Sequence, residues 1–250
     1  MYWQDLATTE FYSFDRATPV ILPVAAVEQH GPHLPIATDR LIAEHFASRL
    51  NEKLGSSVLI LPTIAVGCSA HHMAFPGSLT LTHDTFLSVC EEYLDSARAH
   101  GFRNFLVFNA HGGNRGITQV LLEKFGAANP GCKIAVATWW RAAGEALIPL
   151  NETGLGGVGH ACEFETSLML YIDPSLVRTD AIAPKEIIPT FEWAEDDLLR
   201  TSRVALYRSM QQITPNGVWG DATRASADKG MRISDTVCDA VAVVLADLST

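Results

Sequence analysis

The stretch Val20–Val27, VILPVAAV, and the residues Glu28-Gln29-His30-Gly31 that follow it directly decide the fold class. A short, nearly all-apolar run of this kind is typical of a strand that is buried on both faces. Such strands occur in parallel sheets that helices cover on both sides. The sudden change to carboxylate, amide and imidazole side chains puts chemically active groups at the end of the strand, where α/β proteins bind their ligands.

The rest of the chain alternates between helix and strand patterns, without repeats. After the first strand we expect, in order, a helix over 39–54, a strand over 57–66, a helix between Thr82 and Gly101, a strand over 104–109, a helix over 117–125, a strand over 133–140 and helices over 161–171 and 226–248. Strands separated by helices indicate βαβ units. The pattern predicts an α/β layered fold with a mainly parallel central sheet, built as one domain over residues 1–250.

Composition narrows the class of protein. The 250 residues are 48% apolar and 18% charged, with a formal net charge of −10, which suits a globular core and disfavours binding to nucleic acid or to an anionic membrane. No signal peptide or transmembrane run is recognisable at the level of sequence. The five cysteines form no Cys-x-x-Cys pair, so we expect a reduced, cytoplasmic protein with a small-molecule substrate.

The first polar cluster follows the opening strand. Two carboxylates, those of Glu28 and Asp39, and two imidazoles, those of His30 and His33, lie within twelve residues and make a ligand set suited to Zn²⁺ or Mn²⁺. Side chains alternate along an extended chain, so Glu28 and His30 point the same way. The alternative is a polar turn in which Asp39 only caps the next helix.

The second polar cluster, Asn109-Ala110-His111-Gly112-Gly113-Asn114, comes at the end of the apolar strand 104–109. His111 stands where the sheet edge opens, and the glycines allow a ligand or a neighbouring chain segment to approach the backbone. The alternative is a turn that contains an incidental histidine.

The third cluster lies at 160–167, HACEFETS, at the start of an expected helix. Glu165 shares a helix face with the apolar residues Leu168 and Met169, and a carboxylate aimed into a core is costly unless a cation or hydrogen bonds meet it. Glu163 lies on a different face, where a solvated salt bridge would explain it. We therefore favour Glu165 over Glu163 as a metal ligand.

Other segments give weaker signals. The loop 69–77 can form a pocket wall, although adjacent histidines such as His71 and His72 are more often surface residues. The segment 217–221 is consistent with a loop at the mouth of a site. No P-loop, dinucleotide-binding glycine pattern or Gly-x-Ser-x-Gly motif is present, which removes the usual evidence for ATP, NAD and serine-hydrolase chemistry.

The three clusters together, with FPGS at 75–78 and GVWGD at 217–221, resemble the creatininase (creatinine amidohydrolase) family from about residue 20 to 230. The resemblance implies a three-layer α/β/α sandwich, a homohexamer and two divalent metal ions, zinc or manganese and in some members iron. It implies that Glu28 and His111 hold one ion, that His30 holds the other and that Asp39 bridges both.

The resemblance also implies roles next to the metals. His160 matches a histidine that shuttles a proton, and Ser69 lies near the serine that contacts substrate in the family. We expect His72 and Gly112 to contact substrate as well.

Two departures from the family pattern affect the site. Creatininase has an acidic ligand two positions after the histidine that His111 matches, where this chain has Gly113, so Glu165 is our candidate for the missing ligand. The loop 151–159 lacks the tryptophan with which creatininase closes over its substrate. Creatinine is therefore a disfavoured substrate.

These observations predict a metal-dependent amidohydrolase that cleaves a C–N bond of a small, cyclic amide with a metal-activated water. Two alternatives stay open. One is a related metalloenzyme that opens a ring derived from a polyol ketone, and the other is a non-catalytic metal-binding protein.

Overall fold

Four parallel strands form the central sheet of the computed structural model, which describes residues 1–250. Their order across the sheet is β2 (Leu59–Ile60), β1 (Val20–Val24), β3 (Asn104–Asn109) and β4 (Lys133–Thr138). The register sets Val24, Asn109 and Thr138 side by side at the last position of three strands. The segments that follow these strands therefore leave the sheet along the same edge.

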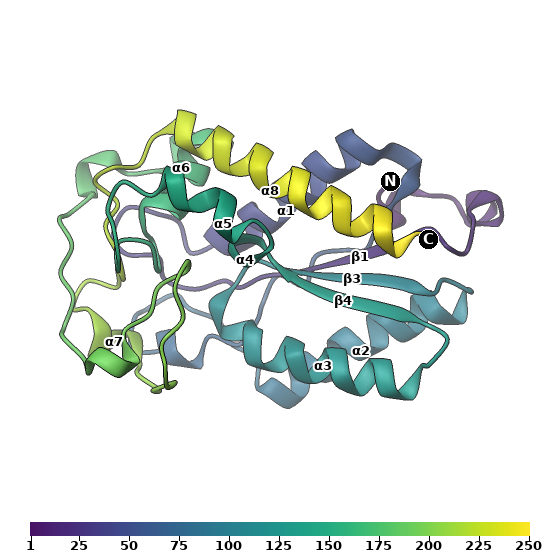
Figure 1. The fold of residues 1–250 in the computed structure, drawn as a ribbon, viewed down its shortest axis with the longest axis horizontal. Helices are drawn as coiled ribbons and strands as arrows, with labels where there is room; N and C mark the ends of the chain where they lie inside the picture. Colours follow the sequence, from purple (N-terminus) through teal and green to yellow (C-terminus); the bar gives the residue numbers. More distant parts are fainter.

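Helices cover both faces of the sheet (Figure 1). On one face lie α1 (Thr38–Leu54), α6 (Glu163–Ile172) and α8 (Ala227–Leu248), and on the other lie α2 (His83–Ala99) and α3 (Arg115–Ala128). Three short helices, α4 (Trp139–Ala142), α5 (Gly144–Leu147) and α7 (Met210–Ile213), complete the set. The predicted α/β/α layering is confirmed.

The strands divide their side chains between two apolar cores. Ile21 and Phe108 join the core beneath α1, α6 and α8, whereas Leu22 and Val107 join the core against α2 and α3. Successive strand residues point to opposite faces, so a strand with a core on each side needs apolar residues at every position. This double burial explains the continuous apolar run that opens β1.

The strand predicted over 104–109 is confirmed, but the prediction over 57–66 was wrong in length, because β2 contains only two residues. Leu59 and Leu61 donate to the carbonyls of Pro19 and Ile21, and this regular alternation of donors ends after Leu61. The chain meets β1 again at Ile64, whose N–H donates to the carbonyl of Pro23 at 3.0 Å. The segment thus continues beside β1 without regular pairing.

The other boundaries differ from prediction by a few residues. β1 ends at Val24 and β4 at Thr138, because Trp139 already begins α4. α8 begins after Ser226, whose hydroxyl accepts a hydrogen bond from the Lys229 N–H at 3.2 Å, a normal N-cap. Element types were thus predicted better than their ends.

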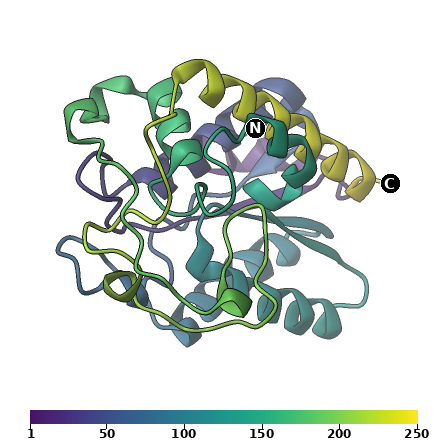
Figure 2. The ribbon, with the colours of Figure 1, turned by 60° about the vertical axis from the view of Figure 1, so that its left-hand side comes forward.

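The chain between α6 and α8 forms the cover over the carboxyl edge of the sheet. Apart from α7 and three short 3₁₀ turns, residues 173–226 have no regular helix or strand. The segment curves past the strand ends on the side away from both termini (Figures 1 and 2). No helix in the chain combines the length and the apolar character that crossing a lipid bilayer requires.

Candidate metal centre

The predicted metal ligands converge at the carboxyl edge of the sheet. Glu28 lies four residues after β1, His111 lies two residues after β3, and Asp39 is the second residue of α1. His30 and Glu165 complete the group, and none of the five side chains belongs to a residue more than 4% exposed. The parallel sheet therefore gathers residues that are up to 137 positions apart, from 28 to 165, into one buried cluster.

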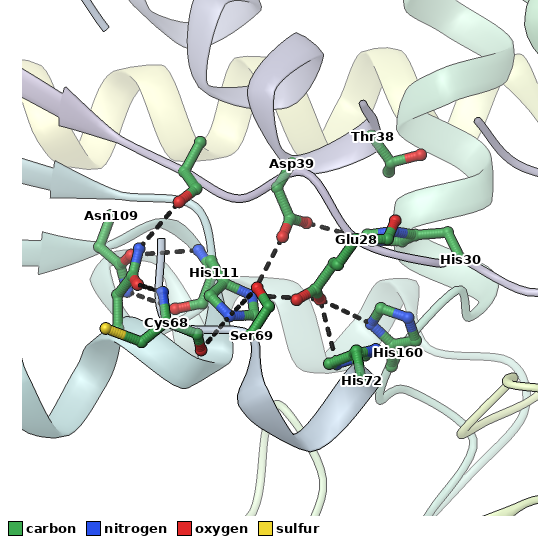
Figure 3. A network of polar contacts seen from close by, with 12 residues as sticks. Glu28, His30, Thr38, Asp39, Cys68, Ser69, His72, Asn109, His111 and His160 are labelled. Atoms are coloured by element: carbon green, nitrogen blue, oxygen red, sulfur yellow. Dashed lines mark hydrogen bonds and ion pairs between the residues drawn. The ribbon is translucent and has the colours of Figure 1, made fainter. Parts of the chain in front are cut away.

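The carboxylate of Asp39 lies between two histidines (Figure 3). Its Oδ2 is 3.0 Å from Nδ1 of His111, and its Oδ1 is 3.1 Å from Nε2 of His30. The other ring nitrogens face carbonyl oxygens: Nε2 of His111 is 3.1 Å from that of Cys68, and Nδ1 of His30 is 3.0 Å from that of Glu28. Because a carbonyl only accepts, these outer nitrogens carry protons, and the inner nitrogens are the ones that would bind a metal ion.

The Asn109 side chain fixes the turn that carries His111. Its Oδ1 accepts a hydrogen bond from the His111 N–H at 3.1 Å, and its Nδ2 donates to the His111 carbonyl at 2.8 Å. The last residue of β3 therefore holds the backbone on both sides of the ligand. This explains why an asparagine ends an otherwise apolar strand.

The Glu28 carboxylate has histidines around it but no aligned hydrogen bond. Its Oε1 is 3.2 Å from Nδ1 of His111, 3.2 Å from Nε2 of His72 and 3.5 Å from Nδ1 of His160. Both Glu28 oxygens and Oδ2 of Asp39 are buried without a hydrogen-bond partner. Burying carboxylate oxygens in this way costs several kcal/mol, roughly, unless a cation meets them.

Glu165 and Glu163 have different surroundings although both are buried in the first turn of α6. Oε2 of Glu165 lies 3.9 Å from Nε2 of His30 and accepts a hydrogen bond from the Ala161 N–H at 2.5 Å. Glu163 instead faces Lys229, with which it forms an ion pair away from the histidines. Of the two glutamates considered, only Glu165 lies beside the other predicted ligands.

The backbone at Gly113 leaves no room for the acidic ligand that the family pattern has there. A Cβ atom at this position would lie 2.2 Å from the carbonyl oxygen of Cys68 and 2.4 Å from Nε2 of His111. No side chain fits without a shift of the surrounding backbone. A carboxylate for this side of the site must come from another part of the chain.

The buried groups shift one another's pKa values. Burial lowers the pKa of His30, but the carboxylates of Asp39, Glu165 and Glu28 together outweigh burial and raise it to about 9. Burial is likewise outweighed at His111, whose pKa Glu28 and Asp39 raise well above the usual value. Burial raises the pKa of Glu165 to about 7. The cluster thus attracts positive charge strongly.

His160 lies beside the carboxylate cluster and retains a neutral ring. Its Nε2 is 2.6 Å from the carbonyl oxygen of Gln29, and its ring centroid is 4.1 Å from that of His30. Burial, with further contributions from His30 and His72, lowers the pKa of His160 well below the usual value. Nδ1 is the nitrogen that faces Glu28 and is free to accept a proton.

The residues expected to contact substrate lie at different depths. Gly112 and His72 line a cavity of about 620 Å³ that opens over the cluster. Ser69 is fully buried, with its Oγ 3.4 Å from Nε2 of His111. The expectation that adjacent histidines lie on the surface was wrong for His72, which is 1% exposed. Their contacts with a substrate stay predictions.

Sequence reasoning placed Asn114 in the second polar cluster but gave it no role. Its Oδ1 accepts a hydrogen bond from the Cys68 N–H at 2.9 Å, and its Nδ2 donates to the carbonyl of Ala25 at 3.1 Å. Asn114 therefore ties the segment after β1 to the loop that supports His111. Its position directly before an amphipathic helix was the signal that could have indicated a structural role.

The chain is similar to known proteins over nearly its whole length. The sequence model of the family Creatininase, described as creatinine amidohydrolase, matches residues 1–245. The mycofactocin precursor peptide peptidase of Mycobacterium ulcerans (strain Agy99) is 34% identical over 88% of this chain and 81% of its own. The creatinine amidohydrolase of Pseudomonas putida is 27% identical over 89% and 86% of the two chains.

A solved structure described as "Creatininase Mn" has the same fold. It superimposes with a TM-score of 0.79 at 24% identity and covers 98% of this chain and 97% of its own. The match to the family over 245 of 250 residues is decisive. The chain belongs to the creatininase family of amidohydrolases.

Proposed function

We propose that the protein is a metal-dependent amidohydrolase that uses water to cleave a C–N bond of a small amide. The observation that carries the proposal is the set of buried oxygens of Glu28 and Asp39 that have no hydrogen-bond partner. The inner ring nitrogens of His30 and His111 face the same space. Carboxylate oxygens and imidazole nitrogens that converge in this way suit divalent cations.

The residues fit two metal ions that share Asp39. Glu28, His111 and Oδ2 of Asp39 would hold one ion, because Nδ1 of His111 lies within 3.2 Å of both carboxylates. His30, Oδ1 of Asp39 and Glu165 would hold the other. Mixed nitrogen and oxygen donors accept Zn²⁺, Mn²⁺ and Fe²⁺. The similar creatininase described with manganese supports Mn²⁺, and we propose Zn²⁺ or Mn²⁺.

Two such ions, when bound, supply an activated water and polarise the scissile carbonyl. His160 is placed to transfer the proton. Its Nε2 is held by the Gln29 carbonyl, so Nδ1 accepts a proton from the attacking water and delivers it to the leaving nitrogen. A pKa lowered by burial keeps the ring neutral and ready for the first of these transfers. His160 is our candidate catalytic residue.

The open cavity argues against a purely structural metal site. Structural zinc sites are closed by protein ligands, whereas a cavity of about 620 Å³ reaches Glu28, Asp39 and Glu165 here. Ring opening at carbon in a polyol-derived ketone stays an alternative that a substrate panel would separate.

Metal content tests the proposal first. Protein purified without chelator should contain about two equivalents of zinc, manganese or iron per chain by elemental analysis. Removal with a chelator should abolish amide hydrolysis, and addition of Zn²⁺ or Mn²⁺ should restore it. Wild-type protein that binds no stoichiometric metal even after this addition, or that remains fully active without it, would contradict the proposal.

The cyclic amide that the sequence favours has a rival in a short peptide. The cavity lies within the range of about 300–1,000 Å³ that accepts drug-sized ligands, and is therefore large for a single small ring. Several curated relatives at 30% identity or more are named as peptide peptidases. A short peptide is therefore our second candidate substrate.

Arg115 favours a substrate with a carboxylate. Among the cavity cations, Lys185 donates to the Gly156 carbonyl and Arg208 to that of Ile188, and Arg200 lies 4.0 Å from Oε2 of Glu195. The Arg115 guanidinium has neither a hydrogen bond nor an ion pair with a protein group. Burial and the nearby Arg141 lower the pKa of Arg115, so an anion placed there would be stabilised.

Matched substrates test this specificity. Acylated dipeptides with a free carboxyl terminus should have a lower KM than the same dipeptides with a terminal amide. Arg115→Gln should remove that preference, and Arg141→Gln, which alters a residue outside the cavity lining, should keep it. If both the wild type and Arg115→Gln prefer a cyclic amide to the dipeptides, a cyclic amide remains the better candidate substrate.

A further inference from the structure

The orientation of the Gln29 side-chain amide is fixed by two backbone groups. Its Oε1 is 2.9 Å from the N–H of Gly31, which only donates, and its Nε2 is 3.1 Å from the carbonyl oxygen of Gly217, which only accepts. The oxygen and the nitrogen of the amide can therefore not be exchanged. One hydrogen of Nε2 points to Gly217, and the second must go elsewhere.

Two histidine nitrogens lie close enough to receive that second hydrogen. They are Nδ1 of His72 at 2.9 Å and Nε2 of His160 at 3.2 Å. Nε2 of His160 lies 2.6 Å from the backbone carbonyl oxygen of Gln29, so this nitrogen already carries a proton and cannot accept. The amide therefore donates to Nδ1 of His72.

The tautomer of His72 follows from this hydrogen bond. A neutral imidazole that accepts at Nδ1 carries its proton at Nε2. Nε2 of His72 lies 3.2 Å from Oε1 of Glu28, so an N–H dipole faces the buried carboxylate. The opposite tautomer would set a lone pair against that oxygen and repel it.

We propose that Gln29 is a positioning residue that acts through His72 on the carboxylate of Glu28, and that it couples this carboxylate to the segment 217–219. The proposal rests on the proposed function, because it takes Glu28 as a metal ligand. Glu28 has no aligned hydrogen bond of its own, so the His72 dipole is the polar contact that orients it from the side away from Asp39.

The segment 217–219 contacts both Gln29 and the neighbouring His160. Gly217 has φ +82°, and a Cβ atom there would lie 2.1 Å from Oε1 of Gln29. Two residues later, the Trp219 backbone exchanges hydrogen bonds with that of His160, at 2.9 Å and 2.6 Å. Trp219 also lines the cavity. A displacement of this segment at the cavity wall is thereby transmitted to the Gln29 amide.

A pair of glycine variants tests the coupling without touching a ligand. Gly217→Ala adds a methyl group that must displace the Gln29 amide, whereas Gly154→Ala, at φ +71°, imposes similar backbone strain with nothing within 4 Å of the new Cβ. We expect Gly217→Ala to weaken metal affinity, measured by competition between Zn²⁺ and a chromophoric chelator, by about 10- to 100-fold. Gly154→Ala should stay within about twofold of the wild type. Equal losses in the two variants would overturn the coupling.

Gln29→Glu tests the tautomer directly. A carboxylate accepts from Gly31 but cannot donate to His72, so Nδ1 of His72 must become the protonated nitrogen. Long-range ¹H–¹⁵N spectra of labelled protein should report an Nε2 proton on His72 in the wild type and an Nδ1 proton in Gln29→Glu, together with weaker Zn²⁺ binding. The same tautomer in both proteins would overturn the proposal.

The proposed function and the role of Gln29 can be contradicted separately. Wild-type protein that binds no metal would contradict the proposed function. Wild-type protein that binds two ions, with unchanged affinity in Gly217→Ala and Gln29→Glu, would leave that function intact and remove the role of Gln29.

Discussion

Glu163 and Glu28 are both fully buried carboxylates, but only Glu163 has hydrogen-bond partners for its oxygens. Glu163 pairs with Lys229 and accepts hydrogen bonds from the backbone of Glu152 and from both donors of Thr153. Glu28 meets only ring nitrogens, without an aligned hydrogen bond. A carboxylate whose oxygens all have partners stabilises the fold, whereas one without partners is a candidate cation ligand.

Removal of the carboxylate between the two histidines should have the largest effect. Asp39→Ala takes away the oxygens that face His30 and His111, so we expect loss of metal loading and a fall in turnover well beyond the roughly 10- to 100-fold that an outer-shell change costs. Elemental analysis and an amide-hydrolysis assay measure both quantities. Normal metal content in Asp39→Ala would contradict the inference that the unpartnered carboxylates bind cations, and with it the contrast between Glu28 and Glu163.

Loss of the Lys229 ammonium should affect stability and leave the metal centre intact. Lys229→Met leaves the Glu163 carboxylate buried without its cation, for which we expect a loss of about 3–5 kcal/mol in the free energy of unfolding. Urea denaturation measures this loss, and the double variant Glu163→Gln with Lys229→Met should recover most of it. If the single variant loses less than about 1 kcal/mol, the ion pair is not the stabilising partner that we infer.

The two glutamates of α6 allow the sharpest test within one helix turn. Glu165→Gln should lower the metal content from about two equivalents to about one, because Oε2 of Glu165 faces His30. Glu163→Gln changes the same chemical group two residues away and should keep both ions while destabilising the fold. The reverse pattern would make Glu163 the ligand.

The sequence predicted the elements and the cluster because both depend on local patterns. The apolar run of β1 and the alternation of helices with strands follow from burial and periodicity, and parallel strands bring Glu28 and His111 to one edge. The choice of Glu165 over Glu163 came from helix geometry, and the surroundings of the two side chains agree with it.

Contacts between segments distant in the chain were beyond the sequence. The pairing of Glu163 with Lys229 spans 66 positions, and the hydrogen bond between Gln29 and His72 spans 43. No local pattern encodes such contacts. The same reason explains the shortened β2, whose pairing is decided by the neighbouring strand as well as by its own apolar residues.

A third kind of polar group, a half-buried neutral histidine with one neutral partner, gives the smallest expected effect. His45 on α1 lies 2.7 Å, through Nε2, from Oγ of Ser234 on α8. Burial, with a contribution from Arg49, lowers the pKa of His45 to about 4. The side chain therefore stays neutral in the folded protein at pH values where it takes up a proton in the unfolded chain.

The sign of the pH dependence follows from that difference. Above a pH of about 6.5 neither state is protonated at His45, and between about 6.5 and 4 the unfolded chain alone gains the proton, so stability is lost as the pH falls. We expect the free energy of unfolding to fall between pH 7 and pH 5 by about 1 kcal/mol less in His45→Gln than in the wild type, allowing for the partial exposure of the ring. Urea denaturation at both pH values measures the difference, and the other buried histidines cancel in it. Parallel stability curves would show that its surroundings do not hold His45 in the neutral state.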